Sequence, residues 1–224
     1  MLSIKAIGES KTEVSYYGAL GRGENQDYYS EGGSRPGIFF GPGANALGLI
    51  GEVQESVLKN LLEGLSPDGQ KRLVQKRAGT IVRRAGFDLT FSLPKSVSVA
   101  WVTADRTTRE EIDRRAQAAL EKTLDVIQEL CGVARRGKDG LIQESAKLVF
   151  AIFSHDTARG LPGHLPDVNR HFHCVLPNLV VREDGTTGAL DARPLFTRRM
   201  KMALGSLFRV RTRAKLSVGI ASVN

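Results

Sequence analysis

Two histidines in an apolar run have the spacing of a metal site. His171 and His173 are separated by one residue, and the alternation of side chains along an extended strand points both imidazoles to the same side. Imidazole nitrogen is a common ligand for metal ions. The pattern therefore predicts a metal site on a strand whose opposite side is packed. The apolar positions of that opposite side are Phe172, Cys174 and Leu176.

A third imidazole could complete the site. His155 follows the apolar run 148–153, and two neighbouring strands could bring it beside the first pair. The remaining histidine, His164, lies in the Gly/Pro-rich stretch 160–166 and is interpreted as a loop residue that could replace one of the three. Histidines on one strand face are also often exposed or hydrogen-bonded without a metal, so the motif alone leaves both interpretations open.

The four tyrosines of the chain form two doublets, at positions 16–17 and 28–29. Aromatic doublets usually pack in a core. These doublets stand among Ser, Gly, Glu, Asn and Asp, which favours hydroxyl groups presented to a ligand over buried rings. We therefore expect a functional role for the tyrosines.

A carboxylate is predicted on the polar face of a strand. Residues 87–92 alternate strictly, with Asp88, Thr90 and Ser92 on one face and apolar side chains on the other. An isolated carboxylate in the middle of a sheet needs a partner, and a metal ion or a metal-bound imidazole would supply one. The alternative is an aspartate that faces the surface at the start of a strand.

Further patterns predict the elements that position these side chains. Thr108 and Glu111 form a capping box, which predicts a helix from there to about Cys131, with Gly132 as its end. The glycine- and proline-rich stretch 32–51 is expected to be turn and loop. The other expected elements are strands over 2–7, 148–154 and 171–181, an extended segment over 97–102, a helix over 53–65 and a basic helix over 196–216.

Length and composition suit one compact globular domain. The chain has 224 residues, of which 41% are hydrophobic, which is enough for a packed core. It has no apolar stretch of membrane-spanning length and no secretory signal, so we expect a cytoplasmic location. The two cysteines make no ligand spacing and are expected to be reduced packing residues. No phosphate-binding loop occurs, which argues against a nucleotide-hydrolysing motor within this chain.

The surplus of positive charge is confined to the last part of the chain. The net charge is +8, and eight basic residues follow Asp191, the last acidic residue. The first 191 residues therefore balance at 24 basic and 24 acidic side chains. Such segregation suggests an element that faces a polyanion, because a cluster of positive side chains attracts nucleic acid by neutralising its phosphates. The alternative is a solvated helix face.

Several motifs occur in one order over nearly the whole chain. They are the start MLS, the two tyrosine doublets, the segment 47–53 (LGLIGEV), the segment 88–98 (DLTFSLPKSVS), the run 155–159 (HDTAR) and the run 171–173 (HFH). Together they resemble the TrwC/TraI-type (MobF) conjugative relaxases of the HUH endonuclease superfamily. The resemblance implies an α+β fold with a central antiparallel sheet, flanked by helices, that holds the histidine strand at its centre.

The resemblance also implies a metal centre. Its ligands would be His155, His171 and His173, and its cofactor would be one divalent metal ion, with Mg²⁺ or Mn²⁺ expected and Zn²⁺ or Ni²⁺ as alternatives. Asp88 would hydrogen-bond a ligand imidazole and fix its tautomer. The metal would polarise a phosphodiester oxygen and stabilise the charge that develops there.

Tyrosine transesterification is the implied reaction. Tyr16 would displace the 3′ oxygen of a phosphodiester, leaving a 5′-phosphotyrosine and a free 3′ hydroxyl. Tyr28 would serve a second strand transfer while Tyr16 is occupied, and Tyr17 and Tyr29 are the other members of the doublets. The partner would be single-stranded plasmid DNA at an origin of transfer. The expected phosphate contacts are Lys95, Arg159 and the basic tail, including Arg198 and Arg199.

The resemblance sets expectations for the whole chain as well. We expect a single relaxase domain over 1–224, without the distal C-terminal part of the family domain and without a helicase domain. We also expect the protein to act as a monomer in the bacterial cytoplasm, with accessory relaxosome proteins as further partners. One alternative is a rolling-circle replication initiator or transposase of the same superfamily, in which the tyrosine usually follows the histidine motif. Another is a non-catalytic DNA-binding module whose metal is structural, in a closed four-ligand shell that includes His164.

Overall fold

A computed structural model describes residues 1–19, 36–75, 84–137, 141–158 and 166–220. Its strands are β1 (Leu2–Ile7), β2 (Ile38–Phe40), β3 (Gly86–Ser92), β4 (Val133–Arg136), β5 (Ile142–Leu148), β6 (Phe150–Thr157), β7 (Val168–Pro177), β8 (Val180–Arg182) and β9 (Thr187–Gly188). Its helices are α1 (Lys11–Ala19), α2 (Pro42–Ala46), α3 (Glu55–Leu62), α4 (Lys95–Thr103), α5 (Arg106–Cys131), the short 3₁₀ helix η3 (Pro194–Phe196) and α6 (Arg198–Ile220).

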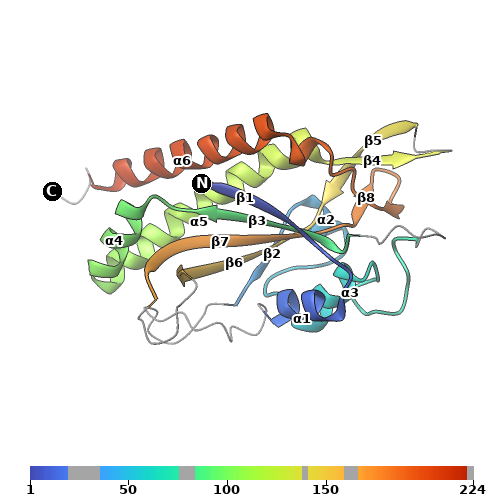
Figure 1. Ribbon diagram of the computed structural model, residues 1–224, viewed down its shortest axis with the longest axis horizontal. Helices are drawn as coiled ribbons and strands as arrows, with labels where there is room; N and C mark the ends of the chain where they lie inside the picture. Colours follow the sequence, from blue (N-terminus) through green and yellow to red (C-terminus); the bar gives the residue numbers. More distant parts are fainter. Residues whose placement is uncertain (20–35, 76–83, 138–140, 159–165, 221–224) are drawn as a thin grey trace.

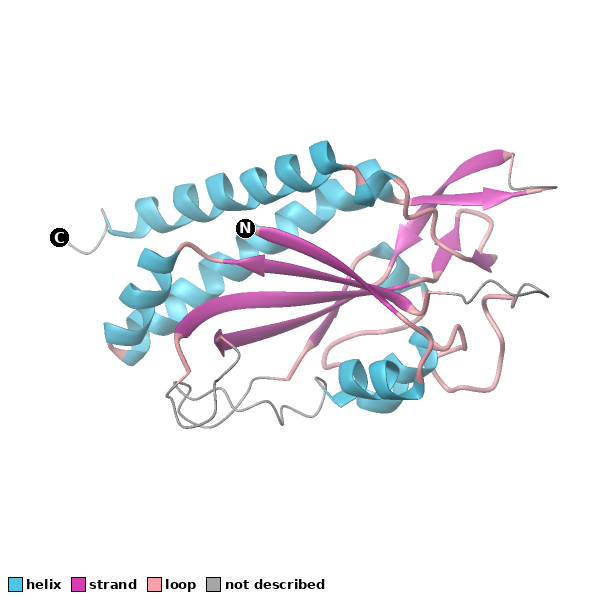
Figure 2. Cartoon of the chain, in the orientation of Figure 1, coloured by secondary structure: helices cyan, strands magenta, loops and turns pink. Residues whose placement is uncertain are grey.

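Five of the described strands form one antiparallel sheet with the histidine strand in its centre. The strand order is β1-β3-β7-β6-β2, so β7 has β3 on one side and β6 on the other. Helices α5 and α6 cover one face of this sheet, and α1 and α3 lie on the other (Figure 1; Figure 2). The α+β fold with a helix-flanked antiparallel sheet is thereby confirmed, as is the central place of β7.

The two faces of the central strands differ in chemistry because side chains alternate along them. Phe87, Leu89 and Phe91 of β3 lie in the main core together with apolar residues of β7. The intervening side chains of β3, including Asp88, lie on the same face as His171 and His173, because Thr90 pairs with His173 in the antiparallel register. One face is therefore the main hydrophobic core, and the other, called the polar face below, carries Asp88 and the histidines beside a smaller apolar cluster under α1 and α3.

Helix α5 supplies most of the helical side of the core. Its apolar stripe includes Leu120, Leu124 and Ile127, all with no exposed surface. The expected start of this helix is wrong by three residues, because Asp105 and not Thr108 is the N-cap, and the Asp105 carboxylate accepts a hydrogen bond from the Thr108 backbone N–H at 2.9 Å.

The other expectations for local structure hold in part. Segment 97–102 was expected to be extended but lies in α4, which begins after Pro94 and buries Ser98 and Trp101 on one side. The stretch 32–51 contains β2 and α2 within its described part, so it is not all loop. The expected strands over 148–154 and 171–181 are shifted, because β5 ends at Leu148 and the second run divides into β7 and β8.

A smaller sheet with the order β4-β5-β8-β9 extends from one end of the molecule (Figure 1). Helix α6 follows it and packs antiparallel to α5, with Leu204 and Phe208 in the main core. Among the described helices, none combines the length and the apolar character needed to span a bilayer.

Candidate active site

Strand pairing brings three histidines together on the polar face of the large sheet. His155 of β6 lies directly opposite His171 of β7, and His173 follows two positions later on the same face. The ring centroids are 5.0 Å apart for His171 and His173, 5.2 Å for His155 and His173, and 5.5 Å for His155 and His171. The three imidazoles predicted from the sequence therefore form one cluster.

The partners of two of these rings determine which nitrogen carries the hydrogen. His173 Nδ1 lies 2.8 Å from Asp88 Oδ2, and His171 Nδ1 lies 2.8 Å from the backbone oxygen of Asn169. Carboxylate and carbonyl oxygens only accept hydrogen bonds, so both Nδ1 atoms donate. Each Nε2 atom consequently presents a lone pair, which is the form of imidazole that binds a metal ion.

When both rings are neutral, the two Nε2 lone pairs face each other, and a cation between them would accept both. The Nε2 atoms of His171 and His173 are 3.2 Å apart. Two nitrogens that bind one tetrahedral ion at about 2.0–2.1 Å would be roughly 3.3 Å apart, so the pair has ligand spacing. The type and spacing of these donors therefore fit a divalent metal ion.

The third ring lies beside the pair, at a different angle to each of its members. Within the described residues, no group of three or more His, Cys, Asp or Glu side chains has its donors arranged for a metal ion as they stand. The ring of the buried His155 is stacked at 25° to His171 and stands at 88° to His173.

Asp88 connects the histidine cluster to the tyrosine helix. Its carboxylate is almost fully buried and accepts hydrogen bonds from His173 Nδ1 and, at 3.2 Å, from the hydroxyl of Tyr17. Burial raises the pKa of the Tyr17 phenol well above its usual value, and the negative charge of Asp88 raises that pKa further. Tyr17 therefore remains a protonated donor to Asp88.

The first tyrosine doublet divides between core and surface. Tyr17 is 3% exposed and packs with Val14 in a cluster that includes Phe153 and Val175. Tyr16 is 49% exposed, and its ring meets the Tyr17 ring edge-on at 5.1 Å. Successive residues of a helix point about 100° apart, which is why α1 can bury one ring and present the other. The expectation that the doublet presents its hydroxyls holds for Tyr16 and is wrong for Tyr17.

Behind the histidine strand lies a buried ion pair that the sequence analysis missed. The Arg170 guanidinium pairs with Asp113 of α5, with both side chains almost fully buried, and it lies 4.5 Å from the Trp101 ring centroid of α4. The Arg170 backbone N–H also donates to Ser98 Oγ at 3.0 Å. This network fixes β7 to two helices at the residue next to His171. No spacing in the sequence links these residues.

The candidate DNA contacts lie at different places. Lys95 forms an ion pair with Asp167 and donates to the backbone oxygen of Val168 at 2.8 Å. Arg198 and Arg199 are exposed in the first turn of α6, where the helix dipole disfavours cations. Four further residues of the sequence analysis lie outside the described residues: Tyr28, Tyr29, Arg159 and His164.

Known proteins are similar to this chain in sequence. The TrwC relaxase family matches residues 10–221 of the chain. The multifunctional conjugation protein TraI of Escherichia coli is 32% identical over 182 residues, which make up 80% of this chain. The chain spans only 9% of the length of that relative.

Solved structures agree with the sequence matches. The metal-bound structure of the conjugative relaxase TrwC in complex with oriT DNA is 28% identical, with a TM-score of 0.80, and the match covers 97% of this chain and 70% of that chain. The structure of TrwC with a 27-mer DNA comprising the recognition hairpin and the cleavage site is 27% identical, with a TM-score of 0.75 and coverages of 97% and 69%.

Proposed function

Since the chain belongs to the TrwC relaxase family, we propose that it is a site- and strand-specific DNA nickase of conjugative plasmid transfer. Its substrate would be single-stranded DNA at an origin of transfer. The TrwC relaxase binds oriT DNA in its solved structures, which supports this substrate for the present chain.

One geometric observation carries the proposal. An exposed phenol, Tyr16, stands beside Tyr17, and Tyr17 is joined through Asp88 to a histidine whose Nε2 lies 3.2 Å from that of His171. A nucleophile and a cation-binding donor pair are the two parts that phosphodiester transfer requires. Both belong to the same polar face of the molecule.

We propose that His155, His171 and His173 hold one divalent metal ion, as the metal-bound TrwC structure supports. When bound, the ion supplies a positive charge beside a non-bridging phosphate oxygen. Asp88 holds His173 with Nδ1 as the donor and thereby keeps Nε2 turned toward His171. Tyr17 keeps Asp88 in place by donating to the same carboxylate.

Tyr16 is the proposed nucleophile, because it is the exposed member of its doublet. Its phenol oxygen forms the new bond to phosphorus, the bond from phosphorus to the 3′ oxygen breaks, and the phenol proton passes to the 3′ oxygen overall. The products are a 5′-phosphotyrosine and a free 3′ hydroxyl. Tyr28 is the proposed nucleophile for a second strand transfer, with the first still occupied.

A denaturing gel tests the proposal. The chain is incubated with Mn²⁺ or Mg²⁺ and a single-stranded oligonucleotide that carries an origin-of-transfer sequence and a label 3′ to the cleavage site. We expect a labelled protein adduct from the wild type and from Tyr17→Phe, and none from Tyr16→Phe unless Tyr28 replaces it. The double variant Tyr16→Phe/Tyr28→Phe should form no adduct.

Two results would contradict this function. An adduct that persists in the double tyrosine variant would remove both proposed nucleophiles. Cleavage of the oligonucleotide without any adduct would indicate a nuclease that uses water instead of tyrosine.

A further inference from the structure

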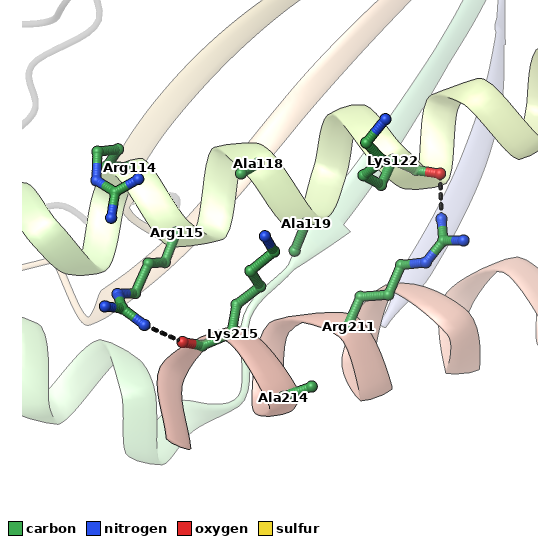
Figure 3. Close-up of a pocket in the computed structure, with 8 residues that line it drawn as sticks. All are labelled: Arg114, Arg115, Ala118, Ala119, Lys122, Arg211, Ala214 and Lys215. Carbon is green, nitrogen blue, oxygen red and sulfur yellow. Dashed lines mark hydrogen bonds between the residues drawn. The ribbon is translucent and has the colours of Figure 1, made fainter. Parts of the chain in front are cut away.

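A basic groove runs between α5 and α6, on the side of the molecule away from the histidines. It encloses about 480 Å³, and small alanine side chains separate the charged groups at its rim (Figure 3). Five of its eight lining residues are cationic. The lining residues are Arg114, Arg115, Ala118, Ala119, Lys122, Arg211, Ala214 and Lys215.

The arginines of the groove are held in place by the opposite helix. Arg211 of α6 donates to the backbone oxygen of Lys122 in α5, and Arg115 of α5 donates to the backbone oxygen of Lys215 in α6 (Figure 3). Each bond uses one of the five N–H donors of a guanidinium. The remaining donors are therefore positioned before a ligand arrives, which lowers the entropy lost on binding.

The acidic neighbours of the groove neutralise only part of its charge. Glu111 forms ion pairs with Arg114 and Arg115, and Asp125 pairs with Lys122. In the described part of the chain, no carboxylate lies within ion-pair distance of Arg211 or Lys215, and α6 contains no acidic residue at all. The groove thus presents excess positive charge to solvent.

This groove is separate from the candidate active site. Helices α5 and α6 cover the apolar face of the large sheet, whereas the histidines lie on the polar face toward α1 and α3 (Figure 1). The cations on α5 span residues 114–122, which corresponds to about 12 Å along the helix. That length suits a few consecutive phosphates of one strand and exceeds a single small anion.

We propose that the α5–α6 groove binds the sugar-phosphate backbone of a second stretch of nucleic acid, on the side of the sheet opposite the reaction centre. The choice of nucleic acid over another polyanion rests on the proposed function. The interaction itself is charge neutralisation and requires neither a specific sequence nor a metal ion.

Salt-dependent binding tests the groove. The full chain is titrated, without divalent metal, into a labelled single-stranded oligonucleotide of mixed sequence, and its fluorescence anisotropy is followed over a series of NaCl concentrations. In the variant Arg211→Ala/Lys215→Ala we expect weaker binding. The slope of log K against log[NaCl] should be smaller in magnitude by about 1.4, because each phosphate contact on a single strand contributes about 0.7 to it.

A matched control separates the groove from net charge. Arg209 and Arg213 lie on the same helix with the same spacing but are exposed on its other side and do not line the groove. The variant Arg209→Ala/Arg213→Ala removes the same charge and should leave the slope unchanged. Covalent adduct formation with a short oligonucleotide limited to the cleavage site should be the same in both variants, so failure of the groove and failure of nicking remain distinguishable.

Three outcomes would overturn the proposal. The first is an equal loss of slope in the control variant, and the second is an unchanged slope in the groove variant. The third is that the wild type binds a labelled poly-glutamate peptide and the groove variant does not, while the groove variant still binds DNA. This result would indicate an acidic protein partner. If the double variant fails to fold, Lys215→Gln alone keeps all interhelix bonds and should reduce the slope by about 0.7.

Discussion

Tyr16 and Tyr17 are neighbours of identical chemistry in opposite environments. The Tyr17 hydroxyl donates to a buried carboxylate, and its pKa is raised by burial and by that carboxylate, so this phenol is unsuited to attack. Tyr16 retains access to solvent. A doublet in the sequence therefore encodes two environments: one phenol is exposed, as the proposed nucleophile must be, and the other is buried and bonded to Asp88.

The first prediction concerns stability at these two positions. Tyr17→Phe should lower the free energy of unfolding by about 2 kcal/mol, because a hydrogen bond to a charged group is lost. Tyr16→Phe should change it by less than about 0.5 kcal/mol, because the side chain is half exposed. Urea denaturation followed by circular dichroism measures both. Equal losses in the two variants would show that the hydroxyl of Tyr17 contributes nothing specific.

The second prediction concerns metal affinity. Asp88→Ala removes the acceptor that fixes His173 with Nδ1 as donor, and such a loss typically weakens metal binding 10- to 100-fold. Isothermal titration with Mn²⁺ measures the change. Asp167→Ala is the control, because this carboxylate is exposed and pairs with Lys95 instead of a histidine. Unaltered affinity in Asp88→Ala would remove Asp88 from the metal centre.

At the scale of elements, periodicity predicted strands well where one face is buried. The alternation of 87–92 predicted β3, and the His-x-His pattern predicted β7. In each case the pattern also predicted which side chains lie on the same face of the strand. The β-branched residues of 97–102 favoured an extended segment. That segment is helical because Pro94 suits a helix start, and because Ser98 and Trp101, three residues apart, are buried together. Such tertiary contacts leave no local pattern, and neither does the Arg170–Asp113 pair.

The third prediction tests the attachment of β7. Arg170→Ala removes the guanidinium that pairs with the buried Asp113, and breaking a buried pair in this way costs about 3–5 kcal/mol of stability. The double variant Arg170→Met/Asp113→Leu removes both charges and should recover most of the loss. Chemical denaturation measures both free energies. A double variant as unstable as the single one would mean that Arg170 acts through the Trp101 ring and not through the ion pair.

At the scale of the whole molecule, the large sheet separates the candidate active site from the basic groove. Its apolar face forms a core with α5 and α6, and its polar face carries the histidines, Asp88 and the tyrosine helix. The basic groove is lined by α5 and α6, the helices that cover this core (Figure 3). The histidine, tyrosine and aspartate motifs of the sequence point to the polar face. The charge of the basic tail predicted an element that faces a polyanion, but the groove itself could not be predicted, because it depends on how α5 and α6 are aligned.

The fourth prediction uses the two cysteines as reporters of this core. Cys131 and Cys174 are fully buried, and burial raises the pKa of Cys131 to about 11. At pH 8 roughly one Cys131 thiol in a thousand would be ionised, and the thiolate is the reactive form. We expect Ellman's reagent to modify neither cysteine in the native protein and both in urea. Rapid modification of either one under native conditions would show that the helical layer opens locally.

Strand β7 contributes to both sides of the molecule, and this limits which sequence changes it can accept. Substitutions that preserve size and polarity affect one side at a time. A one-residue deletion or insertion between His155 and Cys174 that shifts the pairing of β7 by one place would direct imidazoles into the core and phenylalanine toward the polar face. Indels within β7 should therefore be far more damaging than point substitutions, with folding and the proposed nicking lost together.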